Sequence, residues 1–163
     1  MHKSAVISPC GKFRYRLGRR WASGPAMLFI MLNPSTADAS VDDPTIRKCI
    51  GFAERNGADA IEVVNLFAFR ATDPKALAYA GWPVGPDNAE YIARATKEVH
   101  EDEGRIVFAW GANARGRDEA QAMIGDLAYR DIPGYTLRLL LDGTPAHPLM
   151  LPYSCSLQRY YGN

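Results

Sequence analysis

The stretch Ala26-Met-Leu-Phe-Ile-Met-Leu32 is an unbroken apolar run, and the polar loop Asn33-Pro-Ser-Thr-Ala-Asp38 follows it directly. Continuous apolar runs of this length are typical of strands covered on both faces, as in a parallel sheet. Three further runs of this kind follow along the chain, at Ile61–Leu66, Ile106–Ala109 and Leu137–Leu141. We therefore expect four buried strands, with the Asn33–Asp38 loop at the end of the first.

Helical segments are expected between these strands. The first has Asp43 as its N-cap and Pro44 at its first helical position, and residues 56–57 (Asn-Gly) end it. The second runs from about Asp87 to Glu103 and the third from about Arg117 to Arg130. With right-handed crossovers, this order predicts a three-layer α/β/α fold around a central, mainly parallel four-stranded sheet.

An N-terminal β-hairpin is expected before this core. Phe13, Tyr15 and Leu17 alternate with Arg14 and Arg16, which is the period of a half-buried strand, and a Ser-Pro-Cys-Gly turn precedes them. We expect residues 1–163 to form a single α/β domain, with residues 1–22 as a hairpin or arm and residues 26–163 as the core. The arginines expected on a solvated face of the hairpin are Arg14, Arg16, Arg19 and Arg20.

Composition and charge narrow the class of protein. The chain has 163 residues, a formal net charge of +1 and no apolar run long enough to span a bilayer. A general nucleic-acid coat would be more basic. Three widely spaced cysteines and scattered histidines predict neither a disulfide framework nor a zinc site, and no cofactor is expected. We expect a cytoplasmic protein that does not enter the membrane.

Polar loops follow all four predicted strands. In open parallel sheets, ligands bind beyond the carboxyl ends of the strands, near the point where the strand order reverses. Because the ends of parallel strands meet at one edge, these loops together predict a cleft. The loops are residues 33–36, 65–72, 110–113 and 142–148.

Two other chemistries are open from the residues alone. Asp38, Asp42 and Asp43 offer the carboxylate oxygens that Mg²⁺ prefers, although Asp43 already serves as a helix cap. Ser35, His147 and Asp142 contain the residue types of a nucleophilic triad, without the GxSxG elbow. His147 lies in a loop between Ala146 and Pro148, where a catalytic or ligand-binding role is favoured over a core role.

Several motifs together strongly resemble the bacterial and phage "domain of unknown function 1643" family, over nearly the whole chain. The motifs are Leu32-Asn-Pro-Ser-Thr-Ala-Asp38, Asp43-Pro-Thr-x-Arg47, Asn65-Leu-Phe-Ala-x-Arg-Ala-Thr-Asp-Pro74, Ala109-Trp-Gly111 and His147-Pro-Leu149. This resemblance names a family without supplying a function.

The order of these motifs is also similar, more distantly, to the uracil-DNA glycosylase superfamily and especially its mismatch-specific branch. There a first strand ends in G-x-N-P-G, a later strand in T-N-L-V-x-R-A-T, and a last strand precedes H-P-S or N-P-S. The corresponding segments here are Met31-Leu-Asn-Pro-Ser35, Val64–Thr72 and His147-Pro-Leu149. The resemblance implies a uracil-DNA glycosylase-like fold for the core at residues 26–163. It also implies a DNA-repair-like hydrolase that binds DNA or a nucleotide and cleaves the N-glycosidic bond of a nucleobase.

The same resemblance implies roles for particular residues. Asn33 holds the attacking water, His147 donates a hydrogen bond to the departing base, and Asn65 contacts the base edge. Arg47 and Arg70 are candidates for binding phosphate, or else surface charges. Leu149 belongs to an apolar segment that either fills the gap left by a flipped base or packs in the core. The remaining candidates for the substrate site are Pro34, Ser35, Thr36, Asp38, Asp43, Gly111 and Pro148.

Departures from the glycosylase pattern favour a changed substrate. No aromatic residue lies between Ser35 and Lys48, Met31 and Ser35 replace two glycines, and Asp38, Asp42 and Asp43 bring negative charge near the cleft. A modified base, a free nucleotide or a nucleoside fits these differences. The alternatives are a non-catalytic nucleotide- or nucleic-acid-binding module on the same fold and, more weakly, a serine-type hydrolase using Ser35, His147 and Asp142.

Overall fold

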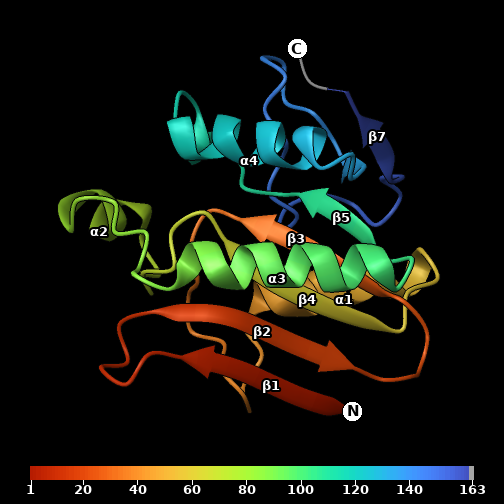
Figure 1. Cartoon of the computed structure of the whole chain (residues 1–163), viewed down its shortest axis with the longest axis horizontal. Helices are drawn as coiled ribbons and strands as arrows, with labels where there is room; N and C mark the ends of the chain where they lie inside the picture. The colour runs from red at the N-terminus through yellow and green to blue at the C-terminus, as the bar shows by residue number, and fades with distance from the viewer. Residues whose placement is uncertain (162–163) are drawn as a thin grey trace.

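A computed structural model of the chain describes residues 1–161, whose strands form one mixed sheet (Figure 1). Over these residues the sheet has seven strands in the spatial order β1-β2-β4-β3-β5-β6-β7. The strands are β1 (His2–Ile7), β2 (Arg14–Arg20), β3 (Ala26–Met31), β4 (Ala60–Asn65), β5 (Arg105–Phe108), β6 (Gly134–Thr136) and β7 (Gln158–Tyr160). The helices are α1 (Pro44–Arg55), α2 (Pro74–Tyr79), α3 (Asn88–Glu101) and α4 (Asp118–Tyr129), and a short 3-10 turn spans Ala112–Ala114.

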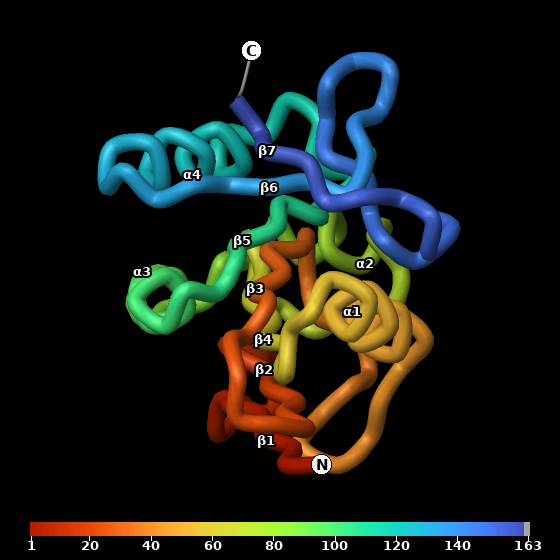
Figure 2. Tube along the Cα trace, turned by 90° about the vertical axis from the view of Figure 1, so that its right-hand side faces the viewer, coloured from red at the N-terminus to blue at the C-terminus, as the bar shows by residue number. Residues whose placement is uncertain are grey.

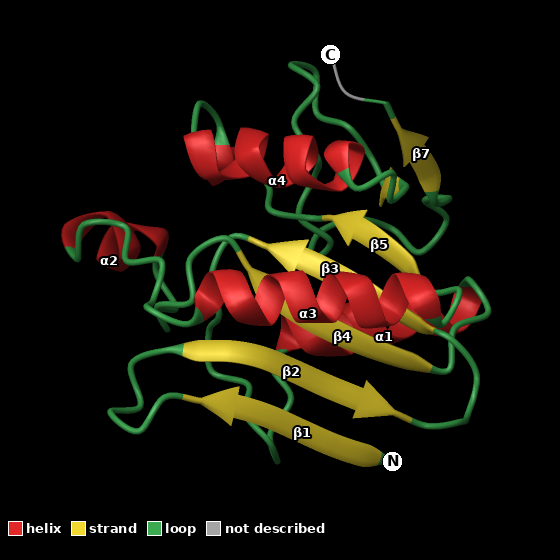
Figure 3. Cartoon of the chain, in the orientation of Figure 1, coloured by secondary structure: helices red, strands yellow, loops and turns green. Residues whose placement is uncertain are grey.

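The centre of the sheet is parallel, as expected. β3 pairs in parallel with β4 on one side and β5 on the other, and β6 continues in parallel beyond β5. Antiparallel strands extend both edges, because β2 pairs with β4 and β7 pairs with β6. The α/β class is confirmed, but the sheet is larger than the four strands expected. Figure 3 shows the β1–β2 hairpin beside β4 as part of the sheet, so residues 1–22 are not a separate arm.

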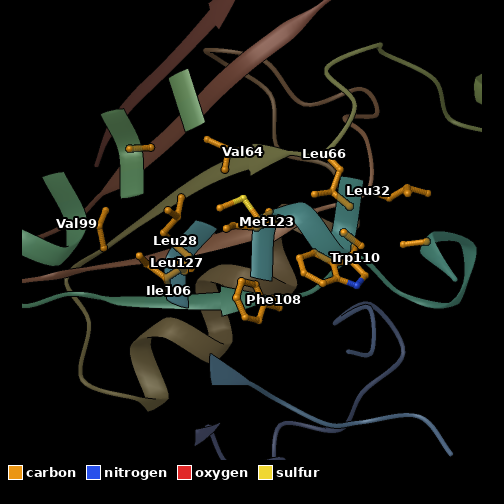
Figure 4. Packing of buried hydrophobic residues seen from close by; sticks show 14 of the residues in the cluster. Leu28, Leu32, Val64, Leu66, Val99, Ile106, Phe108, Trp110, Met123 and Leu127 are labelled. Carbon is orange, nitrogen blue, oxygen red and sulfur yellow. The ribbon is translucent and has the colours of Figure 1, made fainter. Parts of the chain in front are cut away.

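Helices cover both faces of the sheet. Figure 2 shows α3 and α4 on one side of the strands and α1 on the other. On the α3/α4 side, Leu28 of β3 packs with Val99 and Leu127 in one buried apolar cluster (Figure 4). On the α1 side, Phe29 and Phe52 belong to a second cluster. Consecutive residues of β3 thus enter opposite cores, which explains why its sequence is apolar without interruption.

The predicted helices are confirmed, and α1 begins for the expected reason. The side chain of Asp43 accepts a hydrogen bond from the Ile46 backbone N–H at 2.9 Å, and Pro44 occupies the first turn. α3 and α4 lie within the segments predicted for the second and third helices. The short helix α2 was not predicted, although Asp73 caps it in the same way as Asp43 caps α1.

The fourth strand lies earlier than predicted. β6 is Gly134–Thr136, whereas the apolar run Leu137–Leu141 leaves the sheet. Residues 138–146 form backbone hydrogen bonds among themselves instead of with a neighbouring strand: Leu140 N–H donates to the Thr144 carbonyl at 2.8 Å, and Ala146 N–H donates to the Arg138 carbonyl at 2.9 Å. The prediction was wrong because an apolar run does not reveal where its backbone hydrogen bonds go.

A bulge in β2 contradicts the prediction that the arginines of this strand lie together on a solvated face. Ile7 pairs with Arg14 and Val6 pairs with Arg16, so Tyr15 is an extra, unpaired residue. Tyr15 stacks on Tyr91 of α3 with ring centroids 5.2 Å apart. Because one inserted residue reverses the alternation of faces, Arg14 instead reaches the loop after β3, as Arg19 does. Both of these arginines are buried.

None of the helices within residues 1–161 combines the length and the apolar character that crossing a bilayer requires.

We predict opposite effects from two alanine substitutions at glycines. A Cβ on Gly134 would lie 2.5 Å from the Phe108 ring, so Gly134→Ala should lower the free energy of unfolding by about 1–3 kcal/mol. Gly125, in α4, has open space around it, so Gly125→Ala should raise that free energy by about 0.5–1 kcal/mol. Chemical denaturation measures both, and equal effects would contradict the packing of β6 against Phe108.

Candidate functional site

A cavity of about 440 Å³ opens at the carboxyl ends of the central strands. From β3 the chain passes through α1 to β4 on one side, and it later returns through α3 to β5 on the other. Ligands bind at such a reversal of strand order in open α/β sheets. We call this space the site cavity, and it is lined by Arg14, residues 31–36, residues 43–46, Asn65, residues 71–72, Pro74, residues 110–113, His147 and Leu149.

Hydrogen bonds hold the Asn33 side chain in place and leave its side-chain carbonyl oxygen, Oδ1, unpaired among the described residues. Its Nδ2 donates to the Ala71 carbonyl at 2.8 Å and to the Pro34 carbonyl at 3.1 Å. These contacts tie the loop after β3 to the segment after β4. No donor within residues 1–161 bonds the Asn33 Oδ1, so this side chain presents an acceptor to a ligand or a water.

Asn65 is buried with its side-chain amide unpaired. It ends β4, is 1% exposed and lines the site cavity, and neither Nδ2 nor Oδ1 has a partner within the described chain. Its backbone is held firmly, because the Asn88 Nδ2 donates to the carbonyls of Asn65 (2.8 Å) and Leu66 (3.2 Å). An unpaired buried polar group typically costs about 1–3 kcal/mol, so this amide is a candidate ligand contact.

His147 offers a neutral imidazole with a free donor. Its Nδ1 accepts the Leu149 backbone N–H at 3.1 Å, which leaves Nε2 as the protonated nitrogen of the neutral ring. Burial lowers the pKa of His147 below its ordinary value of 6.5, although the negative charge of Asp43 opposes this shift. The ring is therefore neutral at pH 7, with an Nε2–H able to donate.

Gly111 lets the loops after β5 and β6 meet at His147. Its φ of 83° favours glycine, and its N–H donates to the Pro145 carbonyl at 3.0 Å. A Cβ at this position would lie 2.9 Å from the His147 Cβ. Gly111 thus sets the position of His147, a role more specific than the ligand contact expected from the sequence.

The cavity gathers most of the residues predicted for the site. Those lining it are Asn33, Pro34, Ser35, Thr36, Asp43, Asn65, Gly111, His147 and Leu149. Asp43 also has a structural role, since its carboxylate accepts the backbone N–H groups of Ile46 and Ala37.

Four predicted residues lie outside the cavity. Asp38 closes its own turn by accepting the N–H groups of Ser40 and Val41, each at 2.8 Å. Arg47 is exposed and donates to the Asp42 carbonyl, and Pro148 does not line the cavity. Arg70 lines a more open depression of about 1010 Å³ beside it.

Neither a Mg²⁺ site nor a Ser35–His147–Asp142 triad is assembled in the part of the chain that the structure describes. Asp42 is engaged by Arg19 and Lys3, and no group of three or more His, Cys, Asp and Glu side chains is placed to hold a metal ion. Asp142 pairs with Arg115 at 2.6 Å, while the His147 Nδ1 is occupied by Leu149. Ser35, His147 and Asp142 therefore do not form a relay.

Sequence reasoning missed two features of the cavity wall. Arg14 was assigned to a solvated face, and only the bulge at Tyr15 brings it inward. Trp110 supplies an aromatic wall from the end of β5, where it packs on Phe108 (Figure 4). In the glycosylase pattern the stacking aromatic lies between the first loop and its helix, whereas Trp110 follows a later strand.

Comparison with known proteins identifies the family. The family described as protein of unknown function (DUF1643) matches residues 14–149. The chain belongs to this family. No curated protein and no solved structure matches the chain. In this DUF1643 protein, the matched segment runs from Arg14 to Leu149 and so contains every residue that lines the site cavity, whereas the edge strands β1 and β7 lie outside it.

We predict that Gly111→Ala is more damaging than Gly116→Ala in the same loop. Both glycines have positive φ, so each substitution should cost about 1–3 kcal/mol of backbone strain. Only Gly111 faces His147, and overpacking there should add about 1 kcal/mol or more. Chemical denaturation and NMR titration of His147 test this. A changed His147 pKa in Gly116→Ala but not in Gly111→Ala would contradict it.

We also predict a pH dependence of stability from His147. Because its native pKa lies below that of the unfolded chain, the unfolded state binds more protons as the pH falls. The resulting stabilisation is present above pH 6.5 and is lost as the pH falls through the lowered native pKa. His147→Gln removes this dependence, so its stability difference from wild type should shrink on acidification. A difference that is constant between pH 7.5 and pH 5 would contradict the assignment.

Proposed function

We propose that this DUF1643 protein binds a nucleobase in the site cavity and hydrolyses the N-glycosidic bond that joins the base to its sugar. The unpaired amide of buried Asn65 is the observation that carries the proposal. Asn33 and His147 line the same cavity and complete a set with distinct hydrogen-bonding roles.

The Asn65 amide matches the edge of a nucleobase. It presents one acceptor and an NH₂ donor side by side, and base edges carry neighbouring donors and acceptors in the same plane. A base bound here satisfies both groups at once, which removes the penalty of leaving them buried and unpaired. A purely apolar ligand would leave this penalty in place.

His147 is suited to stabilise the departing base. When the C1′–N bond breaks, its electron pair leaves with the base, and negative charge develops on the base oxygens. A neutral imidazole with Nε2–H free donates a hydrogen bond to such an oxygen, while the Leu149 N–H holds the ring in place at Nδ1. Glycosidic cleavage gains most from stabilisation at this developing charge.

Asn33 is suited to position the attacking water. Its NH₂ group already donates hydrogen bonds to backbone carbonyls, so Oδ1 is the atom that accepts a hydrogen bond from water. An amide oxygen does not remove the proton as a carboxylate does. The water oxygen therefore bonds to C1′ as the base departs, and the proton passes to solvent or to the base. Catalysis then depends on position and on leaving-group stabilisation.

One further point supports the proposal, and one does not. The order of polar loops resembles that of the uracil-DNA glycosylase superfamily, and a central parallel sheet with helices on both faces is compatible with that resemblance. Trp110 borders the cavity, but its ring packs in the core and is 2% exposed, so it does not replace the aromatic that is lacking between Ser35 and Lys48.

A base-release assay tests the proposal. The protein is incubated with oligonucleotides carrying uracil, mismatched or modified bases, and with free nucleosides and nucleotides, and released base is measured by chromatography. We expect release that falls about 10²-fold or more in Asn33→Ala and in His147→Ala. His100→Ala is the matched control, since His100 is exposed at the C-terminal end of α3 and does not line the site cavity.

Three outcomes separate the alternatives. Release that is unaffected by both substitutions would contradict the proposed roles. Binding that depends on Asn65 without any release would identify a binding module rather than an enzyme. Covalent labelling of Ser35 by a serine-directed probe would favour a hydrolase that uses that side chain.

A further inference from the structure

Arg14 reaches the site cavity from an unexpected direction. It begins β2, which pairs with β4 at the edge of the parallel strands, and the bulge at Tyr15 turns it toward the loop after β3. The residue is 2% exposed and lines the site cavity together with Asn65. A strand residue outside all four polar loops thus contributes a full positive charge to the cavity.

One edge of the Arg14 guanidinium is unpaired. Nη1 donates to the Ala37 carbonyl at 3.0 Å, whereas Nε is buried without a partner. Nη2 likewise has no hydrogen bond within residues 1–161. Nε and Nη2 form one edge of the planar group. This edge can donate two parallel hydrogen bonds to two oxygens of a phosphate or carboxylate.

Arg19, on the same strand, shows what a structural arginine looks like here. Its Nε pairs with the Asp42 carboxylate at 2.7 Å, Nη1 donates to the Gly18 carbonyl, and Nη2 donates to the carbonyls of Asp38 and Val41. Every nitrogen of Arg19 therefore has a partner in the protein. Arg14 is equally buried but has a partner on only one nitrogen.

The charges around Arg14 leave it cationic. Burial lowers its pKa to about 10, so the guanidinium is protonated at neutral pH. Asp43 is the acidic group that acts on it, but the two Asp43 oxygens already accept the N–H groups of Ile46 and Ala37. Arg70 and Arg19 are the other cations that act on it, and Arg19 is itself paired with Asp42. An anionic group entering the cavity meets the charge of Arg14 on a guanidinium edge that has no partner in the described part of the protein.

We propose that Arg14 binds a phosphate group of the nucleotide whose base contacts Asn65. This inference rests on the proposed function and narrows its substrate class to phosphate-bearing nucleosides. Arg14 takes the phosphate-binding role for which the glycosylase resemblance made Arg47 and Arg70 candidates, and both of those arginines lie outside the site cavity. At about 440 Å³, the cavity is within the range of sites that hold small molecules. The phosphate is either that of a free mononucleotide or the phosphodiester of a strand.

Binding measurements with matched probes test this. The probes are the common nucleosides, their 5′-monophosphates, inorganic phosphate and short single-stranded oligonucleotides, with calorimetry or thermal shift as the readout. Wild type should bind a monophosphate about tenfold or more tightly than its nucleoside, as expected for a bidentate charge-assisted contact. Arg14→Met should abolish this preference, and Arg14→Lys should retain part of it, since lysine keeps the charge without the fork.

Arg20→Met is the control variant. It removes the same charge from β2, but the Arg20 side chain bonds only the carbonyls of Ala22 and Gly24, away from the cavity. The preference for phosphate should survive in this variant. A preference lost equally in Arg20→Met and Arg14→Met would overturn the proposal, because it would show a general charge effect.

The outcomes distinguish this inference from the proposed function. Equal affinity of wild type for nucleoside and monophosphate, with both lost in Asn65→Ala, overturns the phosphate site and leaves base recognition standing. Inorganic phosphate that stabilises wild type but not Arg14→Met, without any binding of nucleosides, supports the phosphate site and removes base recognition. Oligonucleotides that bind more tightly than monophosphates, through Arg14, identify the phosphodiester as the source. If neither Arg14 variant folds, the wild-type comparison alone decides.

Discussion

The position of β3 is the constraint on which the rest of the molecule depends. Both of its edges pair with parallel strands, and both of its faces are covered by buried apolar clusters. A ligand therefore has access to this strand only beyond its ends. From the carboxyl end of β3 the chain passes through α1 to β4 on one side and later through α3 to β5 on the other, and a cavity lies between the loops at the strand ends. The register also sets the chemistry: Met31 pairs with Asn65, so Asn33 begins the loop beside the strand end that carries Asn65.

Two of the four described residues that have buried, unpaired side-chain atoms line this cavity. Five buried side-chain atoms lack a partner within the described residues, and three of them are Asn65 Nδ2, Asn65 Oδ1 and Arg14 Nε. Each such group destabilises the unliganded protein by about 1–3 kcal/mol. Both residues line the same space, and the donors and acceptors they leave unpaired are complementary to those of a base edge and a phosphate. A bound nucleotide accounts for both with a single ligand.

Helix-capping residues and apolar patterns predicted those parts of the fold that neighbouring residues in the sequence determine. Asp43 before Pro44 located the start of α1, and the uninterrupted burial of β3 followed from its apolar run. The fourth strand was misplaced because Leu140 and Ala146 form backbone hydrogen bonds within their own loop rather than with a neighbouring strand. Strand-end logic found Asn33, Asn65 and His147. It missed Arg14, because a single unpaired residue at Tyr15 reverses the alternation and leaves no mark in the sequence.

The most direct test of the account is the free energy of unfolding of Asn65→Leu, measured with and without nucleosides and nucleotides. Leucine has nearly the shape of asparagine and no polar atoms to satisfy. If Asn65 is kept for a ligand, the variant should be more stable than wild type by about 1–3 kcal/mol without ligand and should gain nothing when ligand is added. A variant that is less stable than wild type, yet equally stabilised by those ligands, would contradict the claim that Asn65 recognises a nucleobase.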